Sequence, residues 1–422
     1  MIATAYVGTF KIFGYIAMGL GWIMNLLYEG LCAIGINNIG ITIVILTILI
    51  YTAMLPLTYK QQKFSRLSRK MSPELKALQE KYKGKRDQAS QQAMMEEQRE
   101  IYDKYGISPT GSCLQSFISI LVLFPLYRVI SNVPAYVTRV KETLMPAVDG
   151  IMSTDDYQSV FDSVVSEFGI SLSNIGVKTT EISSLTETTD IQNRIVDILY
   201  KCSPANWDTL IATFPSVDLT SVEEAFSNIN TFLMINVTYS PQYSFMNGIK
   251  TGDVVLIIFG LLIPILAALS QLINLKLMPQ VGNGDDAMER QMKMMNYMMP
   301  LMSLFFCFTL PFGLGIYWIV GALIRSVYQF FLNKHFDKID LNDIIEANRE
   351  KAAKKKEKRG INIEKMQQAA RLNTKTLKSS SMTEEEREEL LAKADEIKKN
   401  AQPGSLAARA NIVREFNEGI KK

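Results

Sequence analysis

The stretch "MSLFFCFTLPFGLGIYWIVGALIRSVYQFF", residues 302–331, decides the fold class of this 422-residue chain. It contains a single charged side chain, and it is longer than the roughly 20 apolar residues that one membrane-spanning helix needs. Proline and glycine residues interrupt the run near its middle, where they break a helix: Pro311, Gly313 and Gly315. The pattern predicts two spanning helices, residues 294–312 and 313–332, joined by a tight turn and lying side by side.

The same criterion identifies three more spans, residues 39–59, 113–133 and 254–275. The predicted fold class is therefore an all-α polytopic membrane protein with five spanning helices. The predicted segments outside these spans are an N-terminal segment, a cytoplasmic hairpin, an outer insert, a cytoplasmic loop and a basic tail: residues 1–38, 60–112, 134–253, 276–293 and 333–422.

Charged residues orient the spans, because cytoplasmic segments of membrane proteins carry an excess of Lys and Arg. Residues 60–112 hold 12 Lys and Arg against 7 Asp and Glu, and residues 333–422 hold 21 against 16. Residues 135–250 hold 6 against 14. We therefore predict that the first loop and the C-terminal tail are cytoplasmic and that the long acidic loop lies outside.

Residues 12–36 are compatible with two topologies. Gly14, Gly21, Asn25 and Glu29 fall near one face of a helix, and apolar side chains fill another face. This amphipathic pattern favours a helix that lies in the outer membrane interface. A sixth span is the alternative, and it would preserve every other orientation.

Residues 60–105 are rich in helix-forming residues and are interrupted by Gly84, which predicts a helical hairpin with Pro73 kinking or restarting its first arm. A solvated connector is the alternative interpretation of its charge. An apolar stripe on the first arm needs a cover, which the second arm or the lipid surface would supply. The stripe consists of Leu67, Met71, Leu75, Leu78 and Tyr82.

Most cofactor chemistry has no support in the sequence. Four cysteines, Cys32, Cys113, Cys202 and Cys307, are isolated from one another, so neither a zinc site nor a disulfide framework is indicated. His335 is the single histidine, and no glycine-rich phosphate loop is present. We therefore expect no bound metal or cofactor, no ATP-driven pump and no enzyme activity.

Polar side chains inside the predicted spans gather in their cytoplasmic halves. Arg325 is the most costly of them, because a charge in the bilayer costs at least about 2.5–3.5 kcal/mol on insertion scales and usually faces a wet cavity. It lies nine residues from Lys334 at the cytoplasmic end, a depth of about 13 Å. We predict a hydrophilic groove, open to the cytoplasm, that carries this charge; interhelical hydrogen bonding is the alternative for the uncharged residues. The predicted lining comprises Thr47, Tyr51, Gln115, Ser116, Ser119, Trp318 and Gln329.

Four stretches resemble the YidC/Oxa/Alb membrane protein insertase family in their order and spacing: "IGITIVILTILIYTAMLPLTYKQQ", "SPTGSCLQSFISILVLFPLYRVI", "QMKMMNYMMPLMSLFF" and "PFGLGIYWIVGALIRSVYQFF". The resemblance implies a five-helix core in the bacterial cell membrane. It implies that this core accepts hydrophobic segments of nascent proteins from the cytoplasm and releases them sideways into the lipid bilayer, alone or beside the Sec translocon. It also favours the interfacial position for the N-terminal helix.

The chain departs from the family pattern at two positions. The family carries an arginine where this chain has Tyr51, and it commonly has proline where this chain has Gln115. Both Tyr51 and Arg325 lie nine residues from a cytoplasmic lysine, at a similar depth. We therefore predict that the groove charge has moved to Arg325, and that Trp318, two turns earlier, points into the groove with it.

Five methionines offer unbranched side chains that suit varied client sequences, although core packing is their favoured role: Met294, Met295, Met298, Met299 and Met302. The hairpin and the basic tail are candidate contacts for the ribosome and for signal recognition particle machinery. A small-molecule or ion permease is the alternative function, and a purely structural assembly factor is the third.

Overall fold

The computed structural model describes residues 11–84, 87–107, 111–172, 179–278, 286–351 and 353–354. Within these ranges, the side chains at positions 89, 111–120, 286–290, 292, 293, 295 and 296 are not described. The chain divides into two compact units, Met1–Leu341 and Asn342–Lys422. In the second unit, residues 342–351 and 353–354 are helical, and the other residues of this unit lie outside the described residues.

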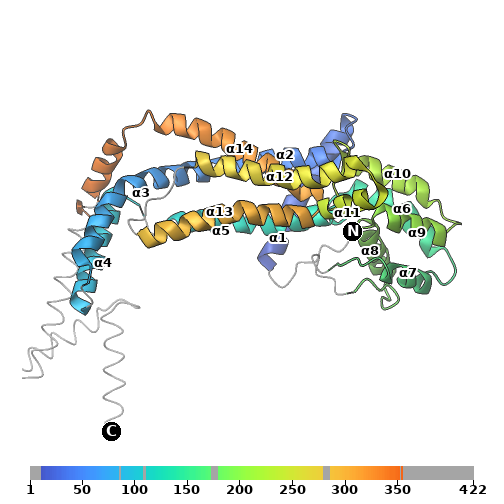
Figure 1. Ribbon diagram of the computed structural model, residues 1–422. Coiled ribbons are helices and arrows are strands. Elements are labelled where there is room, and N and C mark those ends of the chain that lie inside the picture. Colours follow the sequence, from blue (N-terminus) through green and yellow to red (C-terminus); the bar gives the residue numbers. More distant parts are fainter. Residues whose placement is uncertain are drawn as a thin grey trace, which may run out of the picture. The chain divides into compact units, whose positions relative to one another are not determined.

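The described part of the first unit is almost entirely helical, which confirms the all-α fold class (Figure 1). Three helices are each long and apolar enough to cross a membrane: α1 (Lys11–Ala33), α12 (Val254–Leu277) and α14 (Phe312–Phe336). A fourth candidate is the bent pair α2 (Ile39–Ala53) and α3 (Leu55–Tyr82). Two shorter apolar stretches belong to α5 (Gly111–Ser131) and α13 (Asp286–Thr309): Leu121–Ser131 and Tyr297–Thr309.

The helix over the first predicted span, residues 39–59, is broken at Met54 rather than continuous, and its two parts are bent by 52°. Pro56 follows the break, and its missing N–H group cannot continue the hydrogen bonds of α2. The second part continues as α3 to Tyr82, so one helix joins the membrane segment to the hairpin. Pro73 lies inside α3 without ending it.

The helical hairpin consists of α3 and α4 (Gln88–Tyr105) packed against each other. Two ion pairs join the arms, from Lys81 to Glu97 at 2.6 Å and from Lys104 to Glu74 at 2.7 Å. Helix α3 packs against α4 and also contacts α5 and α14. Four of the five side chains in its apolar stripe are buried: Leu67, Met71, Leu75 and Leu78. The second arm therefore supplies much of the cover that the stripe requires.

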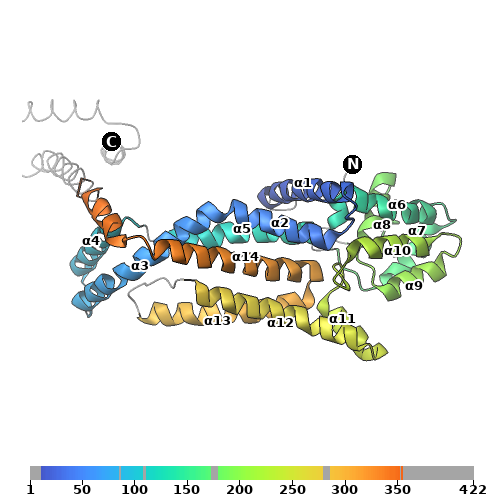
Figure 2. The same cartoon turned by 90° about the horizontal axis from the view of Figure 1, so that it is seen from above.

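Helix α12 lies between α13 and α14 and packs along both, as Figure 2 shows for α12 and its two neighbours. The expectation that residues 294–312 and 313–332 lie side by side is wrong beyond their turn, because α12 occupies that space. Gly313 and Gly315 do not break the helix. They lie buried inside α14, where a Cβ at Gly315 would come within 2.8 Å of the Cys307 sulfur, so they permit close packing.

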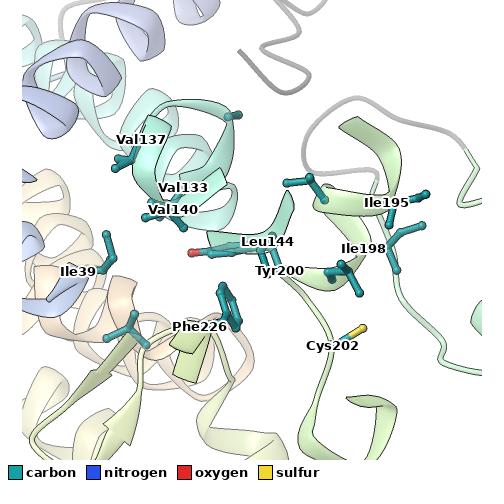
Figure 3. Close-up of a cluster of buried hydrophobic side chains, with 14 of the residues drawn as sticks. Ile39, Val133, Val137, Val140, Leu144, Ile195, Ile198, Tyr200, Cys202 and Phe226 are labelled. Carbon is teal, nitrogen blue, oxygen red and sulfur yellow. The ribbon is translucent and has the colours of Figure 1, made fainter. Parts of the chain in front are cut away.

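The segment between α5 and α12 forms a folded insert that begins with a short 3-10 helix, η1 (Val133–Ala135). Trp207, Phe161 and Phe226 are fully buried in its core, which continues to Ile39 at the start of α2 (Figure 3). Its other elements are α6 (Thr138–Met152), α7 (Tyr157–Ser166), α8 (Thr188–Leu199), α9 (Pro204–Thr213), α10 (Leu219–Asn230), β1 (Thr231–Phe232), β2 (Ile235–Asn236) and α11 (Pro241–Thr251).

Helix α1 packs against α5 and α2 through a face of small and apolar side chains that includes Gly14 and Gly21. Asn25 accepts a hydrogen bond from the backbone N–H of Thr138 at 3.0 Å, and Glu29 pairs with Arg139 at 2.7 Å. The polar groups of α1 therefore bind the first turn of α6. The exposed side of the helix is apolar, with Ile12, Tyr15, Trp22 and Leu26.

Candidate functional site

Arg325 and Tyr51 are in direct contact, although 274 residues separate them in the sequence. Arg325 projects from the middle of α14, and its Nη1 donates a hydrogen bond to the Tyr51 hydroxyl near the end of α2. Its Cζ also lies 4.9 Å from the centroid of the Tyr51 ring, within the range of a cation–π contact. Nη2 donates to Gln271 Oε1 of α12 at 3.2 Å. Side chains from three helices thus meet at one half-buried guanidinium.

Tyr317 extends this cluster toward the insert end of α14. Its hydroxyl lies 3.2 Å from the Tyr51 hydroxyl, and the two rings are nearly parallel, with centroids 6.2 Å apart. Tyr317 is 5% exposed, so the hydroxyl pair supplies the hydrogen bond that a buried phenol requires. The two tyrosines and the arginine form one connected polar group, which we call the Arg325 cluster.

Gly321 makes room for the Tyr51 ring on the surface of α14. A Cβ at this position would lie 2.6 Å from Tyr51 Cε2 and 3.0 Å from the Tyr51 hydroxyl oxygen. Any larger residue would push the ring away from α14. The glycine, one turn before Arg325, therefore lets the ring and the guanidinium share the same stretch of helix.

A second polar layer lies one turn further along α14. Gln329 is 6% exposed, and its amide nitrogen donates to Gln62 Oε1 of α3 at 2.6 Å. Gln62 in turn donates to Asn333 Oδ1 at 2.5 Å, and Asn333 donates to the backbone carbonyl of Leu277 at 3.1 Å. These three side-chain amides connect α3, α12 and α14 by hydrogen bonds.

Arg66 closes this layer at the end of α14. It pairs with Asp337 at 2.7 Å and donates to the backbone carbonyl of Asn333 at 3.2 Å. Its guanidinium also lies 5.6 Å from the ring centroid of Phe336. Arg66 and Arg325 therefore differ, because Arg66 has a carboxylate partner while Arg325, among the described residues, bonds only to neutral oxygens.

The other predicted groove residues occupy different environments. Thr47 is 1% exposed, and its hydroxyl donates to the Ile43 carbonyl within α2, so it belongs to the helix packing rather than to an open surface. Trp318 is half-buried and packs against the hydrophobic core. The side chains of three predicted lining residues lie outside those described: Gln115, Ser116 and Ser119.

The favoured role of the methionines, core packing, is wrong for the four whose side chains are described. These side chains are exposed rather than buried, although α13 packs against α12 and also contacts α11 and α14. Their exposed fractions are 70% for Met294, 50% for Met298, 66% for Met299 and 46% for Met302. The side chain of Met295 is not among those described.

A spacing of four residues on α14 would have extended the prediction from Arg325 and Gln329 to their neighbours on the same side of the helix. Polar residues and one glycine recur at this interval along one gradually turning side of the helix: Tyr317, Gly321, Arg325, Gln329, Asn333 and Asp337. Gln62 gave no such signal, because it follows the predicted end of the first span and resembles a solvated hairpin residue. Its role depends on α3 continuing unbroken from the membrane segment.

Comparison with known proteins identifies the family. The family described as "60Kd inner membrane protein" matches residues 32–339, from the end of α1 to just beyond α14. The Membrane protein insertase YidC of Bifidobacterium longum (strain NCC 2705) is 31% identical over 132 residues, which are 30% of this chain and 39% of that protein. The Membrane protein insertase YidC 2 of Bacillus anthracis is 40% identical over 78 residues, 18% of this chain and 30% of that protein.

A chloroplast protein is also similar. The Inner membrane protein PPF-1, chloroplastic, of Pisum sativum is 29% identical over 122 residues, 29% of this chain and 26% of that protein. The chain thus spans about a quarter to two fifths of the length of these relatives. Because the family match covers most of the chain, including the helices that form the Arg325 cluster, the chain belongs to the 60Kd inner membrane protein family, that of the YidC, Oxa and Alb proteins.

Proposed function

We propose that this chain is a membrane protein insertase. It receives hydrophobic segments of nascent proteins from the cytoplasm in a hydrophilic groove and releases them sideways into the lipid bilayer. Two of the relatives are named membrane protein insertases, and the family match extends across the membrane helices of this chain. In this topology the α3–α4 hairpin and the C-terminal tail are cytoplasmic and the insert lies outside, as the Lys and Arg excess supports.

The observation that carries the mechanism is that no acidic side chain among the described residues pairs with Arg325. Charged side chains within membrane helices are costly and usually pair with an opposite charge. Among the described residues, Arg325 is bonded only to Tyr51 and Gln271, both neutral. Its positive charge therefore remains available to a polar or acidic flank of an incoming segment.

The contact between Tyr51 and Arg325 supports relocation of the family's groove charge. The family resemblance places an arginine at position 51, and here a guanidinium from α14 reaches that side chain instead. A charge supplied from α14 would act in the same region as one supplied from α2. The Tyr51 ring and the Gln271 amide then hold the guanidinium in place while a client binds.

Release of the client would be lateral, between two neighbouring helices of the bundle. The groove holds the polar flank near Arg325 and shortens the distance that it must cross through hydrocarbon. The apolar part of the client then moves into lipid between α2 and α14. Met294, Met298 and Met302 on α13 would offer adaptable contacts to clients of varied sequence.

The partners of this activity are nascent membrane proteins and the lipid bilayer. The Sec translocon is a further partner for clients whose insertion needs both the translocon and this chain. The α3–α4 hairpin and the basic tail would contact the ribosome and signal recognition particle machinery, since a basic segment attracts polyanions. These assignments depend on the cytoplasmic position of the hairpin.

A reconstitution experiment separates insertion from the permease alternative. The purified full chain in lipid vesicles is given a short hydrophobic client, and insertion is scored by protection of the client from protease. We expect protection that depends on the chain and no solute flux through the same vesicles. Concentration-dependent flux of a small solute without client protection would overturn the proposal in favour of a permease.

A further inference from the structure

The β1–β2 hairpin of the insert ends in an unusual turn. Leu233 and Met234 occupy its two central positions with φ values of +48° and +68°. A two-residue hairpin of this kind needs positive φ at both positions, and Asn-Gly is the sequence that fits it best. Leu233 and Met234 are nevertheless large and apolar, and they are 72% and 75% exposed. The turn therefore keeps two apolar side chains at its tip against the local backbone preference.

The base of the hairpin is fixed to the ends of two membrane helices. The Asn38 side-chain amide donates to the Thr231 carbonyl at 2.7 Å. Phe232 lies directly against Gly40 of α2, since a Cβ added at Gly40 would lie 2.3 Å from the Cβ of Phe232. Beyond β2, the backbone N–H of Gly313 donates to the Val237 carbonyl at 2.9 Å. The hairpin is thus held against the first turns of α2 and α14.

These contacts give the depth of the tip. Ile39 begins the apolar run of α2, so Gly40 lies near the edge of the hydrocarbon. Leu233 and Met234 follow Phe232 by one and two residues, which places them within about 7 Å of that level at about 3.3 Å per residue. The polar layer on each side of the hydrocarbon core is about 5–7 Å thick. The tip therefore lies within reach of this layer.

The composition around the hairpin matches a lipid interface. Residues 225–249 contain no Asp, Glu, Lys or Arg, although residues 135–250 as a whole hold 20 of them. Asn, Gln, Ser, Thr and Tyr supply the polar side chains of this segment. Within it, α11 leads into the first turn of α12 and also exposes apolar side chains, Met246 at 49% and Ile249 at 55%.

We propose that Leu233 and Met234 insert into the boundary between lipid headgroups and acyl chains, where they anchor the insert to the membrane. The anchor would fix the insert relative to the ends of α2 and α14. It depends on the membrane location of the chain and not on the insertase function. The occupant is the bilayer, because the tip lies within reach of the polar layer of the membrane and within a stretch of 25 residues, 225–249, that carries no Asp, Glu, Lys or Arg.

Methionine oxidation tests this proposal on the unaltered chain. The full chain in lipid vesicles is exposed to hydrogen peroxide, which converts accessible Met to the sulfoxide. Met95 on α4 is the matched control, because its exposed fraction is 61% against 75% for Met234. We expect Met234 to be oxidised several-fold more slowly than Met95, since lipid covers it. Equal rates, or a faster rate at Met234, would overturn the proposal.

A second measurement distinguishes lipid from a protein cover. An environment-sensitive fluorescent side chain is introduced at position 234, or at position 212, which is exposed on α9 of the insert. We expect spin-labelled lipid to quench the fluorophore at 234 and iodide to quench it at 212. Shielding from iodide at 234 without quenching by lipid would show that a protein surface, such as a second copy of the chain, covers the tip, and would overturn the lipid assignment.

Discussion

Replacement of Tyr51 by phenylalanine tests whether the Arg325 cluster acts as a unit. The change removes only the hydroxyl that accepts the hydrogen bond from Arg325 and lies 3.2 Å from the Tyr317 hydroxyl. The ring stays, and with it the contact of 4.9 Å between its centroid and the guanidinium carbon. The experiment therefore separates the hydrogen bond from the cation–π contact.

The expected magnitude follows from the charge on the donor. Hydrogen bonds to charged groups contribute about 1.5–3 kcal/mol in soluble proteins. Hydrogen bonds between membrane helices average about 0.6 kcal/mol and reach about 1.7 kcal/mol, because the unfolded helices find other partners. Arg325 is charged and half-buried, so we expect Tyr51→Phe to lower the free energy of unfolding by about 1–2 kcal/mol, near the upper end of the membrane range.

A double-mutant cycle with Arg325→Met isolates the pair. Reversible unfolding of the full chain in mixed micelles, followed by far-ultraviolet circular dichroism, gives the free energy for the wild type, both single variants and the double variant. We expect a coupling energy of about 1 kcal/mol or more between Tyr51→Phe and Arg325→Met. Tyr328→Phe is the matched control, because its hydroxyl lies 2.6 Å from Thr52 Oγ1 of α2 and does not bond to Arg325.

The reasoning would be refuted by additive effects. Independent sites add to within about 0.3–0.5 kcal/mol, so a coupling inside that range for Tyr51 and Arg325 would mean that their contact contributes nothing specific. A coupling of the same size in the control cycle with Tyr328 would also contradict the account, because it would show that removal of Arg325 disturbs α14 as a whole.

Two further predictions concern packing and pH. Gly321→Ala places a methyl group 2.6 Å from the Tyr51 ring, and we expect it to lower the free energy of unfolding by about 1–3 kcal/mol. The control is Gly19→Ala, whose methyl group meets no atom within 4 Å and should stabilise α1 by up to about 1 kcal/mol. Equal effects of the two changes on unfolding in micelles would contradict the packing argument. Burial lowers the pKa of Lys201 to about 8, although Asp197 opposes this shift. The unfolded chain keeps that proton to about pH 10.4, so the stability of the insert should rise from pH 8 to pH 10 in the wild type and remain flat by comparison in Lys201→Met, as measured by hydrogen exchange; parallel profiles would contradict it.

The sequence was sufficient to predict the fold class, because long apolar runs are a strong local signal. It also identified Arg325 as a candidate site residue, because a charge inside a predicted span is costly; its role in a groove stays a prediction. It also gave the apolar stripe of the hairpin, whose burial follows from helical spacing. Prediction failed where the outcome depended on which helix becomes a neighbour. Gly313 and Gly315 resemble turn residues in the sequence, and only the position of α12 shows that they permit packing.

The candidate site was predicted in part for the same reason. Arg325 and Tyr51 were identified separately by their depth, but their contact required the relative positions of α2 and α14. Gln62 could not be found, because its importance depends on the bend at Met54 and on the continuation of α3. The Leu233 turn was also invisible, since the sequence lacks the Asn-Gly signal by which such turns are recognised.

The most direct test of the central claim is complementation of an insertase-depleted bacterium, scored by protease protection of a short phage-coat-type client. We compare the wild type, Arg325→Ala, Arg325→Ala combined with Tyr51→Arg, and Arg128→Ala as a control charge near the insert end of α5. We predict that the wild type and the control insert the client, that Arg325→Ala does not, and that the double variant recovers insertion because its arginine enters the same cluster. Full insertion by Arg325→Ala at wild-type expression would contradict the claim that Arg325 supplies the groove charge.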